Sequence, residues 1–187
     1  MIMNDIVQSQ VIATVKNDQE LDKAIASKSN VIFLLTGDLH STPLSIEKIR
    51  ERNKFVFLHV DLIDGLAISK NSMKYVAKHW RPDGIISTRT NTIKQAKLEN
   101  LLTIQRIFLI DNNALNNGIS LAHNANPDAI EILPGLMPEI IHQLTTSTKL
   151  PIIAGGLVNT EQQIMTGLKA GALAISASSP NLWNLNL

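Results

Sequence analysis

The chain has 187 residues, of which 44% are hydrophobic and 18% charged, a composition typical of one globular domain and not of a disordered protein. Seventeen Lys and Arg against sixteen Asp and Glu leave a formal net charge of +1, so any binding of an anionic partner must depend on local charge. Cysteine is absent, which excludes disulfides and thiolate chemistry. No apolar run has membrane-spanning length and residues 1–10 do not resemble a signal peptide, so we expect a cytoplasmic protein with no membrane partner.

Short apolar runs rich in β-branched residues recur along the whole chain. They lie at 11–15, 31–35, 55–60, 84–87, 102–108, 129–133, 151–154 and 173–177. Their starts are 18 to 29 residues apart, which leaves room for one helix of roughly 10 residues and two short loops between successive runs. Continuously apolar runs are typical of parallel strands that are covered on both faces.

This repeat predicts an α/β fold, a compact single-domain (β/α)8 barrel over residues 1–187 with its structured core at about 11–183. The alternative is an open doubly wound sheet, which is less favoured because such sheets usually have five or six strands. Helix-start signals follow several runs. The expected starts are Thr42 ahead of Pro43, Asn91, Pro138, and Thr160 with Gln163 at capping-box spacing.

In such a barrel the functional face is at the carboxyl ends of the strands, so polar residues there are the candidates for a site. Gly155 and Gly156 follow the seventh run and would let a ligand approach the backbone closely. Ser176 and Ser178, with a short helix expected at about 181–184, would add hydroxyls and amides for the same anion. The alternative is a tight turn with capping serines; we favour a phosphate site because both segments follow the strands where such sites form.

Two arginines near the expected barrel mouth require an anionic partner. Asp61 and Glu131 could brace Arg89 and Arg106 as an internal ion-pair network, or they could accept hydrogen bonds from ligand hydroxyls while one arginine sits near a phosphate. We favour the second interpretation. His59 alone is expected to be a packed and satisfied residue. The candidate ligand-binding residues are Asp61, Arg89, Gln105, Arg106, Glu131, Gly135, Gly155, Gly156, Ser176 and Ser178.

Signs of catalysis are few. No lysine lies inside the eight runs, so Schiff-base chemistry is poorly supported, and no third metal ligand accompanies His59 and Asp61. We therefore expect no catalytic residue, no metal, no cofactor and no enzyme activity. The alternative is a polyol-phosphate or sugar-phosphate isomerase, aldolase or transferase on the same barrel, because one fold hosts many functions. In that case His59 and Glu131 could act as an acid and base pair.

Five segments in order carry a resemblance to a known family. They are HVDLIDG at 59–65, GIISTRTN at 84–91, Gln105-Arg106, EILPG at 131–135 and AGGL at 154–157. With them the chain resembles the glycerol-3-phosphate-responsive antiterminators of Gram-positive bacteria, from about residue 11 to 183. The resemblance implies a barrel that binds glycerol 3-phosphate as an effector and stabilises the leader mRNA of a glycerol utilisation operon. The segment 176–180 departs from the pattern expected there, since it is poorer in Thr and Asn, so the phosphate donors after the eighth strand are in doubt.

The resemblance assigns no RNA-contacting residues, so these must be sought in local charge. Lys70, Lys74, Lys78 and Arg81 have the spacing of one helix face, with Trp80 adjacent. A solvated basic helix face is the favoured interpretation, because a 4% aromatic content offers few stacking platforms. A further alternative is a dimerising scaffold with a vestigial site, and a homo-oligomer is left open. A second, weaker basic segment consists of Lys48, Arg50, Arg52 and Lys54, diluted by Glu47 and Glu51.

Overall fold

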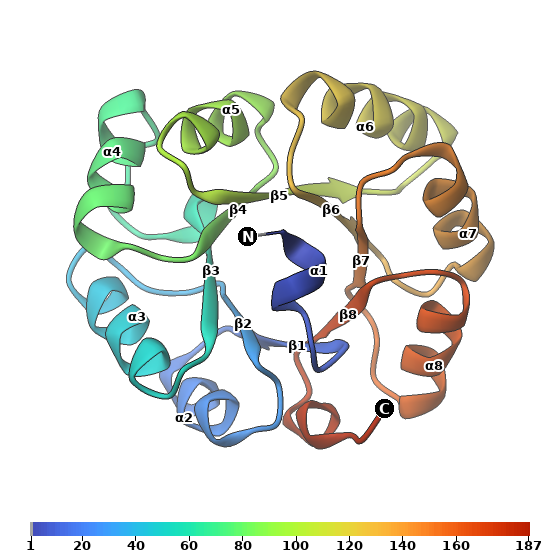
Figure 1. The fold of residues 1–187 in the computed structure, drawn as a ribbon, viewed down its shortest axis with the longest axis horizontal. Helices are drawn as coiled ribbons and strands as arrows, with labels where there is room; N and C mark the ends of the chain where they lie inside the picture. The colour runs from blue at the N-terminus through green and yellow to red at the C-terminus, as the bar shows by residue number, and fades with distance from the viewer. Residues whose placement is uncertain (1) are drawn as a thin grey trace.

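The protein is a closed barrel of eight parallel strands that pair in sequence order from β1 to β8 and back to β1 (Figure 1). The computed structural model describes residues 2–187, except for the side chain of Leu121. The eight-stranded barrel is confirmed and the open sheet is excluded. Each strand begins and ends within one residue of an apolar run. The strands are β1 Val11–Val15, β2 Val31–Leu34, β3 Phe55–His59, β4 Gly84–Ser87, β5 Leu102–Phe108, β6 Ala129–Leu133, β7 Ile152–Gly155 and β8 Ala174–Ala177.

Helical segments alternate with the strands and form the outer ring (Figure 1). A 3-10 turn, η1, directly follows β3, and the short helix expected after β8 is the 3-10 helix η3. None of the helices in residues 2–187 has the length and hydropathy needed to cross a bilayer. The helices are α1 Met3–Ile6, α2 Asp18–Ala26, α3 Ser41–Glu51, η1 Val60–Leu62, α4 Lys70–Tyr75, η2 Val76–Trp80, α5 Thr90–Leu98, α6 Asn112–Ala125, α7 Pro138–Ser147, α8 Glu161–Lys169 and η3 Pro180–Asn184.

Alternation along the strands divides the buried apolar residues into two clusters. One cluster fills the barrel and includes Ile12, Phe33, Phe57 and Ile104. The other lies between the strands and the helices and includes their sequence neighbours, for example Leu58. Since successive residues of a strand point to opposite faces, the position of each polar residue relative to these clusters decides whether it faces into the barrel.

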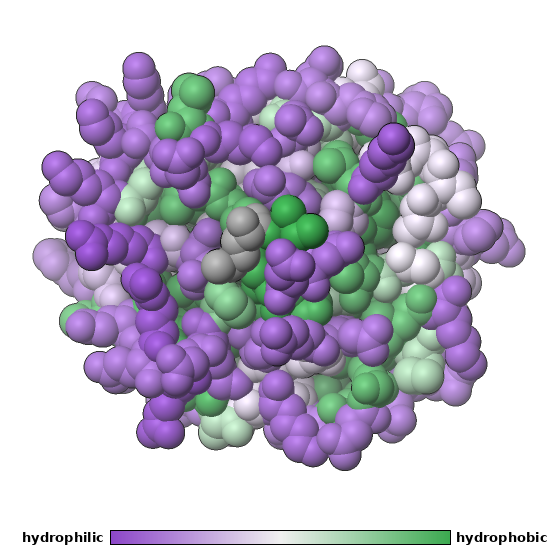
Figure 2. All heavy atoms as spheres, in the orientation of Figure 1, coloured by the Kyte–Doolittle hydropathy of each residue, from purple (hydrophilic) through white to green (hydrophobic). Residues whose placement is uncertain are grey.

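Helix α1 closes the amino end of the barrel. Met3, Ile6 and Val7 are buried and belong to the cluster that fills the barrel interior. Figure 1 shows α1 lying across the opening of the barrel, inside the ring of strands. In the same view, Figure 2 shows hydrophilic side chains over the outer helices and hydrophobic side chains near the centre, around α1. This end is therefore an apolar seal, which leaves the opposite end for ligands.

Two of the expected helix starts are confirmed and two are corrected. Thr160 caps α8 with the expected box, accepting a hydrogen bond from the Gln163 amide, and Pro138 is the first residue of α7. Thr42 does not cap α3: the helix begins at Ser41, and Thr42 lies inside it with a buried Oγ1 that has no hydrogen-bond partner.

The cap of α3 comes instead from Asp38, whose Oδ1 accepts the amides of His40 and Ser41 at 2.7 and 2.8 Å. The backbone hydrogen bonds from Ser41 and His40 lower the pKa of Asp38. Asn91 does not cap α5 either, since α5 begins at Thr90 and Arg89 occupies the cap position. Both helices thus begin slightly before the residues that the sequence signals indicated.

Candidate functional site

A polar layer lies inside the barrel directly above its apolar filling. Two residues beyond the inward-facing Ile12, Phe57, Ile104, Ala129 and Ala174, each strand carries a polar residue. Because this spacing keeps the side chain on the same face of the strand, all five polar residues face into the barrel near its carboxyl end. They are Thr14, His59, Arg106, Glu131 and Ser176, and each is at least nine-tenths buried.

Three members of this layer form a chain of strong hydrogen bonds. Arg106 Nε donates to Glu131 Oε2 at 2.7 Å, and Ser176 Oγ donates to Glu131 Oε1 at 2.7 Å. The Arg106 and Glu131 side chains are only 6% and 1% exposed, so the ion pair lies out of solvent. Within residues 2–187, the two terminal nitrogens of Arg106 have no side-chain or carbonyl acceptor. Each carboxylate oxygen of Glu131 thus accepts one hydrogen bond, whereas the guanidinium group of Arg106 donates only through Nε.

His59 lies in the same layer with an unpartnered nitrogen. It is 3% exposed, and its Nδ1 is buried without a hydrogen-bond partner among the described residues. Burial, with a smaller contribution from the positive charge of Arg106, lowers the pKa of His59 to about 4, although Asp61 acts in the opposite direction. The imidazole is therefore uncharged at neutral pH. The expectation of a packed His59 is confirmed, but the expectation that its polar atoms are satisfied is wrong.

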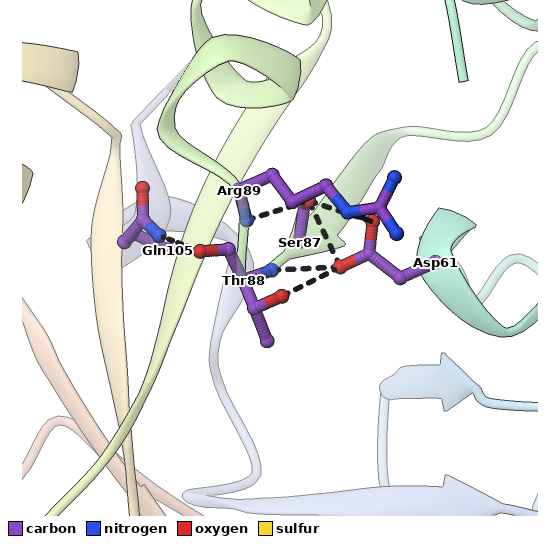
Figure 3. A network of polar contacts seen from close by, with 5 residues as sticks. All are labelled: Asp61, Ser87, Thr88, Arg89 and Gln105. Carbon is purple, nitrogen blue, oxygen red and sulfur yellow. Dashed lines mark hydrogen bonds and ion pairs between the residues drawn. The ribbon is translucent and has the colours of Figure 1, made fainter.

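Asp61 joins the end of β3 to the end of β4 (Figure 3). Its carboxylate accepts hydrogen bonds from Ser87 Oγ at 2.9 and 3.0 Å, from the Thr88 amide at 2.8 Å and from Thr88 Oγ1 at 3.1 Å. Arg89 Nε lies 3.9 Å from Asp61 Oδ1, and the Arg89 side chain is 63% exposed. Both expected arginine and carboxylate pairs thus exist, but Asp61 already uses its oxygens to fix the β3 and β4 ends.

Gln105 does not join the other candidates inside the barrel. It lies between the inward-facing Ile104 and Arg106 in β5, so its side chain points outward. Its Nε2 donates to the Thr88 carbonyl at 2.9 Å, as Figure 3 shows, while its buried Oε1 has no hydrogen-bond partner within the described chain. Gln105 therefore supports the β4 end from outside the barrel.

The glycines after β6 and β7 allow two loops to pack backbone against backbone. The Gly135 amide donates to the Gly156 carbonyl at 3.2 Å, and a Cβ on Gly135 would lie 2.7 Å from the Gly155 amide nitrogen. A Cβ on Gly155 would overlap Ser176 Oγ and lie 3.1 Å from Glu131 Oε1. Gly155 thus leaves the space that the Ser176 to Glu131 hydrogen bond occupies.

The expected phosphate position is formed by adjacent strand ends. β7 and β8 pair in parallel with Gly155 opposite Ser176, so Gly156 and Ser178 follow neighbouring strands at the same end of the barrel. Gly156 has a φ of +73°, a conformation that suits glycine. Ser178 is partly buried and has no side-chain hydrogen bond to a described residue. The register therefore brings together the residues of the expected cup.

The sequence did not single out two further residues of this site, Thr14 and Thr88, and it misjudged His59. The signal that finds them is the two-residue step from an inward apolar position in β1, β3 and β4, which requires knowing which face of each strand is inward. No group of three or more His, Asp or Glu side chains in residues 2–187 is arranged to hold a metal ion.

Comparison with known proteins identifies the family. The family model described as glycerol-3-phosphate responsive antiterminator matches residues 11–183. The uncharacterized protein YgcP of Escherichia coli K12 is 35% identical over 178 residues, which are 95% of this chain and 93% of the relative. The crystal structure of a glycerol uptake operon antiterminator regulatory protein from Listeria monocytogenes has 34% identity and a TM-score of 0.89, and covers 92% of this chain and 94% of that chain.

A second crystal structure, of a glycerol uptake operon antiterminator-related protein from Thermotoga maritima, has 29% identity and a TM-score of 0.82. It covers 92% of this chain and 96% of that chain. The resemblance carried by the five segments is thereby confirmed over nearly the whole barrel. The chain belongs to the glycerol-3-phosphate-responsive antiterminator family.

Proposed function

We propose that this chain binds glycerol 3-phosphate at the carboxyl end of its barrel and, in that state, binds and stabilises the leader mRNA of a glycerol utilisation operon. Family membership supports the effector and the regulatory role. The observation that carries the ligand site is His59 Nδ1, which is buried without a partner in residues 2–187, in the same layer as Arg106, whose Nη atoms make no hydrogen bond to the described protein. Buried polar groups without a partner cost free energy, so a site that keeps them is suited to a ligand that supplies the missing hydrogen bonds.

The electrostatics of the polar layer favour a neutral, hydroxyl-bearing end of the ligand. Glu131 cancels the charge of Arg106 at 2.7 Å, and His59 is uncharged because its pKa is lowered to about 4. The layer thus offers hydrogen-bond donors and acceptors without net charge, as the two hydroxyls of glycerol 3-phosphate require. An organic acid in place of the hydroxyls would bring a carboxylate into a neutral, water-poor layer at a high desolvation cost.

The phosphoryl group of the ligand is then expected at the rim of the barrel, the carboxyl ends of β7 and β8. Gly156 permits close approach of the backbone and Ser178 has a hydroxyl that no described side chain uses. Strand ends at this position are a frequent phosphate site in barrels of this kind. The ligand would therefore lie with its phosphate at the rim and its hydroxyls toward Arg106 and His59.

The proposal assigns no catalytic turnover to the site. His59, with its lowered pKa, could act only as a neutral imidazole at physiological pH, and Glu131 is held by two hydrogen bonds from Arg106 and Ser176. A general acid or base acts best with a pKa near 7, and the pKa of His59 is lowered well below that value. The polar layer is accordingly assigned to binding.

Calorimetric titration of the wild-type protein with glycerol 3-phosphate tests this proposal, with glycerol as the ligand that lacks the phosphate. Saturable binding of glycerol 3-phosphate and none of glycerol are expected. The variant Ser178→Asp places a carboxylate at the phosphate position and is expected to weaken binding more than about tenfold, because like charges repel. Ser178→Asn, of nearly the same size and uncharged, is the matched control and should change the affinity about threefold or less.

Gly155 is not a suitable probe of the phosphate, because any side chain there would displace Ser176 from Glu131. For the regulatory role, read-through of a terminator in the operon leader is measured in a purified transcription reaction. Read-through that rises with both protein and glycerol 3-phosphate supports the proposal. A wild-type protein that does not bind glycerol 3-phosphate, or that converts a sugar phosphate into a product, contradicts it.

A further inference from the structure

The two basic segments found in the sequence meet on one side of the barrel. η2 packs beside α3, and Figure 1 shows α3 and α4 as neighbours in the outer ring. Arg50 Nη1 donates to the Arg81 carbonyl at 3.2 Å, and Arg81 Nε donates to the Lys78 carbonyl at 3.0 Å. The two arginines are therefore held next to each other by main-chain carbonyl groups, each with guanidinium nitrogens left over.

The helix after β3 is not the regular α-helix that the lysine spacing assumed. It changes from α4 into a π-helical turn at Val76, closed by a hydrogen bond from the Arg81 amide to the Val76 carbonyl at 2.9 Å. Arg81 then ends the helix in the left-handed conformation, with φ of 52°. π-turns inside helices are rare and occur often at functional sites, because they re-aim side chains at the expense of regular hydrogen bonding.

An aromatic platform lies where α4 passes into the π-turn, formed by residues four positions apart on the helix. Tyr75 and His79 have ring centroids 4.5 Å apart and an interplanar angle of 31°, and Tyr75 also meets Trp80 edge to face at 6.3 Å. Trp80 is buried and anchors the cluster, whereas Tyr75 is 53% exposed and His79 is exposed. Sequence spacing pointed to Trp80 as the aromatic neighbour of the lysines, but the exposed rings belong to Tyr75 and His79.

Within residues 2–187, none of the cations around this platform forms a salt bridge, although Arg50 interacts with the carboxylate of Asp83 at longer range. Arg50, Lys74, Lys78 and Arg81 are exposed, and no carboxylate in residues 2–187 lies within 4.0 Å of their charged nitrogens. By contrast, Lys97 on the neighbouring α5 is paired with Asp128 at 3.2 Å. Lys54, which the sequence grouped with this region, is used structurally, since its Nζ donates to the Ser27 and Ser29 carbonyls at 2.7 and 2.6 Å.

A groove of about 350 Å³ runs beside the platform between α3 and η2. Arg50, His79 and Arg81 line it together with the buried Trp80, and two carboxylates, Glu47 and Glu51, lie on its α3 side. Cations and exposed rings at one edge suit a phosphate backbone with unstacked bases, while carboxylates can accept hydrogen bonds from base amino groups. An isologous contact with a second copy would place these cations against one another, and this repulsion disfavours a dimer through this face.

We infer that the surface formed by Arg50, Lys74, Tyr75, Lys78, His79 and Arg81, the basic-aromatic surface, binds single-stranded RNA. Tyr75 and His79 stack with a base, and the four cations contact phosphates. This inference rests on the proposed function, because it assigns a location to the RNA contact of that function. It places the RNA on the outer side of the α3 and α4 units, away from the ligand at the barrel mouth.

The test uses a fluorescein-labelled single-stranded RNA selected on the full wild-type protein from a random pool in the presence of glycerol 3-phosphate. Affinity is measured by fluorescence anisotropy over a salt series. Lys74→Glu with Lys78→Glu is expected to raise the Kd by more than about tenfold and to lower the salt slope by about 1.4, because two phosphate contacts are lost. The charge-matched control, Lys149→Glu just after α7 with Lys169→Glu on α8, lies across the barrel from α3 and α4 (Figure 1) and should change the Kd about threefold or less.

Tyr75 gives a test that does not depend on charge. Tyr75→Leu keeps an apolar side chain over Trp80 but removes the ring, and is expected to raise the Kd about tenfold through lost base stacking. Tyr75→Phe keeps the ring and should bind within about twofold of wild type. Calorimetry with glycerol 3-phosphate on every variant verifies that the barrel is intact.

The outcomes separate this inference from the proposed function. Wild-type binding of RNA that neither the double charge reversal nor Tyr75→Leu weakens overturns the inference and leaves the proposed function standing. Failure to select any RNA overturns both. Sedimentation that shows a dimer dissociated by the charge reversal, with RNA affinity unchanged, assigns the surface to a second copy and also overturns the inference.

Discussion

The amino and carboxyl ends of the barrel use the same eight strands for opposite purposes. At the amino end, inward residues such as Phe33 and Phe57 are fully buried, meet edge to face at 5.9 Å and are sealed by α1. Two residues further along the strands, the inward positions carry Arg106, Glu131 and His59, which are nearly as buried but charged or polar. Inward side chains are buried to a similar extent at both ends, so the two ends differ in the chemistry of those side chains.

This contrast indicates how stability and function are divided along the strand axis. Burial of apolar surface at the amino end stabilises the fold directly. Burial of an ion pair at the carboxyl end contributes little net stability, because desolvation of both ions offsets their attraction. A layer that contributes little to folding, and keeps His59 Nδ1 buried without a partner in residues 2–187, suits a binding site.

The largest effect is expected at the apolar end. Phe57→Ala removes a fully buried ring from the barrel filling and should lower the free energy of unfolding by about 4 kcal/mol, through lost burial and the cavity left behind. Urea unfolding followed by circular dichroism measures the change. The folded variant should bind glycerol 3-phosphate like wild type. Loss of detectable binding would show that the apolar filling and the polar layer do not act independently.

At the polar end, removal of both members of the buried ion pair should abolish ligand binding at little net cost in stability. Arg106→Met leaves the carboxylate of Glu131 without its cation and should lower the free energy of unfolding by about 3 kcal/mol, because an uncompensated charge then stays buried. Arg106→Met with Glu131→Leu removes both charges and should recover most of that stability. Urea unfolding measures both.

Calorimetry on the same two variants completes the comparison. Because both lack the guanidinium group, both should lose detectable binding of glycerol 3-phosphate, although only one is unstable. A double variant that is stable and still binds the ligand would remove Arg106 from the site.

His59 links the polar layer to pH. Its pKa of about 4 in the folded protein lies below the unperturbed value near 6.5, so on acidification the unfolded chain takes up the proton first and the folded state is destabilised. The contribution of His59 is therefore constant above about pH 6.5 and should fall by about 2 kcal/mol by pH 5. Urea unfolding of wild type and His59→Gln at pH 7 and pH 5 isolates this term, since other titrating groups are common to both. Equal losses in the two proteins would contradict the lowered pKa.

Sequence reasoning succeeded for features that depend on the residues of a single strand. All eight strands could be predicted because parallel strands covered on both faces are continuously apolar, and the glycines and serines after β7 and β8 fall at adjacent strand ends as expected. Because these strands are apolar on both faces, the sequence does not show which face of a strand points into the barrel. In β5, apolar residues flank Gln105 and Arg106 on both sides, so nothing in the sequence says that Arg106 enters the barrel while Gln105 points out toward the helices.

Tertiary contacts decided the remaining features. The π-turn at 76–80 contains no glycine or proline that would indicate it in the sequence. It forms where Trp80 is buried while Tyr75 stays at the surface. The environment of His59 includes the charge of Arg106 on β5, a residue distant from it in the sequence. Such features follow from closure of the barrel, so single-segment patterns could not reveal them.

The smallest effect distinguishes the rim of the carboxyl end from its interior. Asp61→Asn keeps the shape of the side chain but replaces charge-assisted hydrogen bonds to Ser87 and Thr88 with neutral ones, which are about half as strong, and should lower the free energy of unfolding by about 1 to 2 kcal/mol. Asp64→Asn, an exposed carboxylate in the same loop without side-chain hydrogen bonds to described residues, is the matched control and should change it by about 0.5 kcal/mol or less. Because Asp61 oxygens are committed to the protein, glycerol 3-phosphate affinity should change about threefold or less. A large loss of affinity in Asp61→Asn with little loss of stability would instead make Asp61 a ligand contact, and would move the site outward from the Arg106 and Glu131 layer toward the β3 and β4 ends.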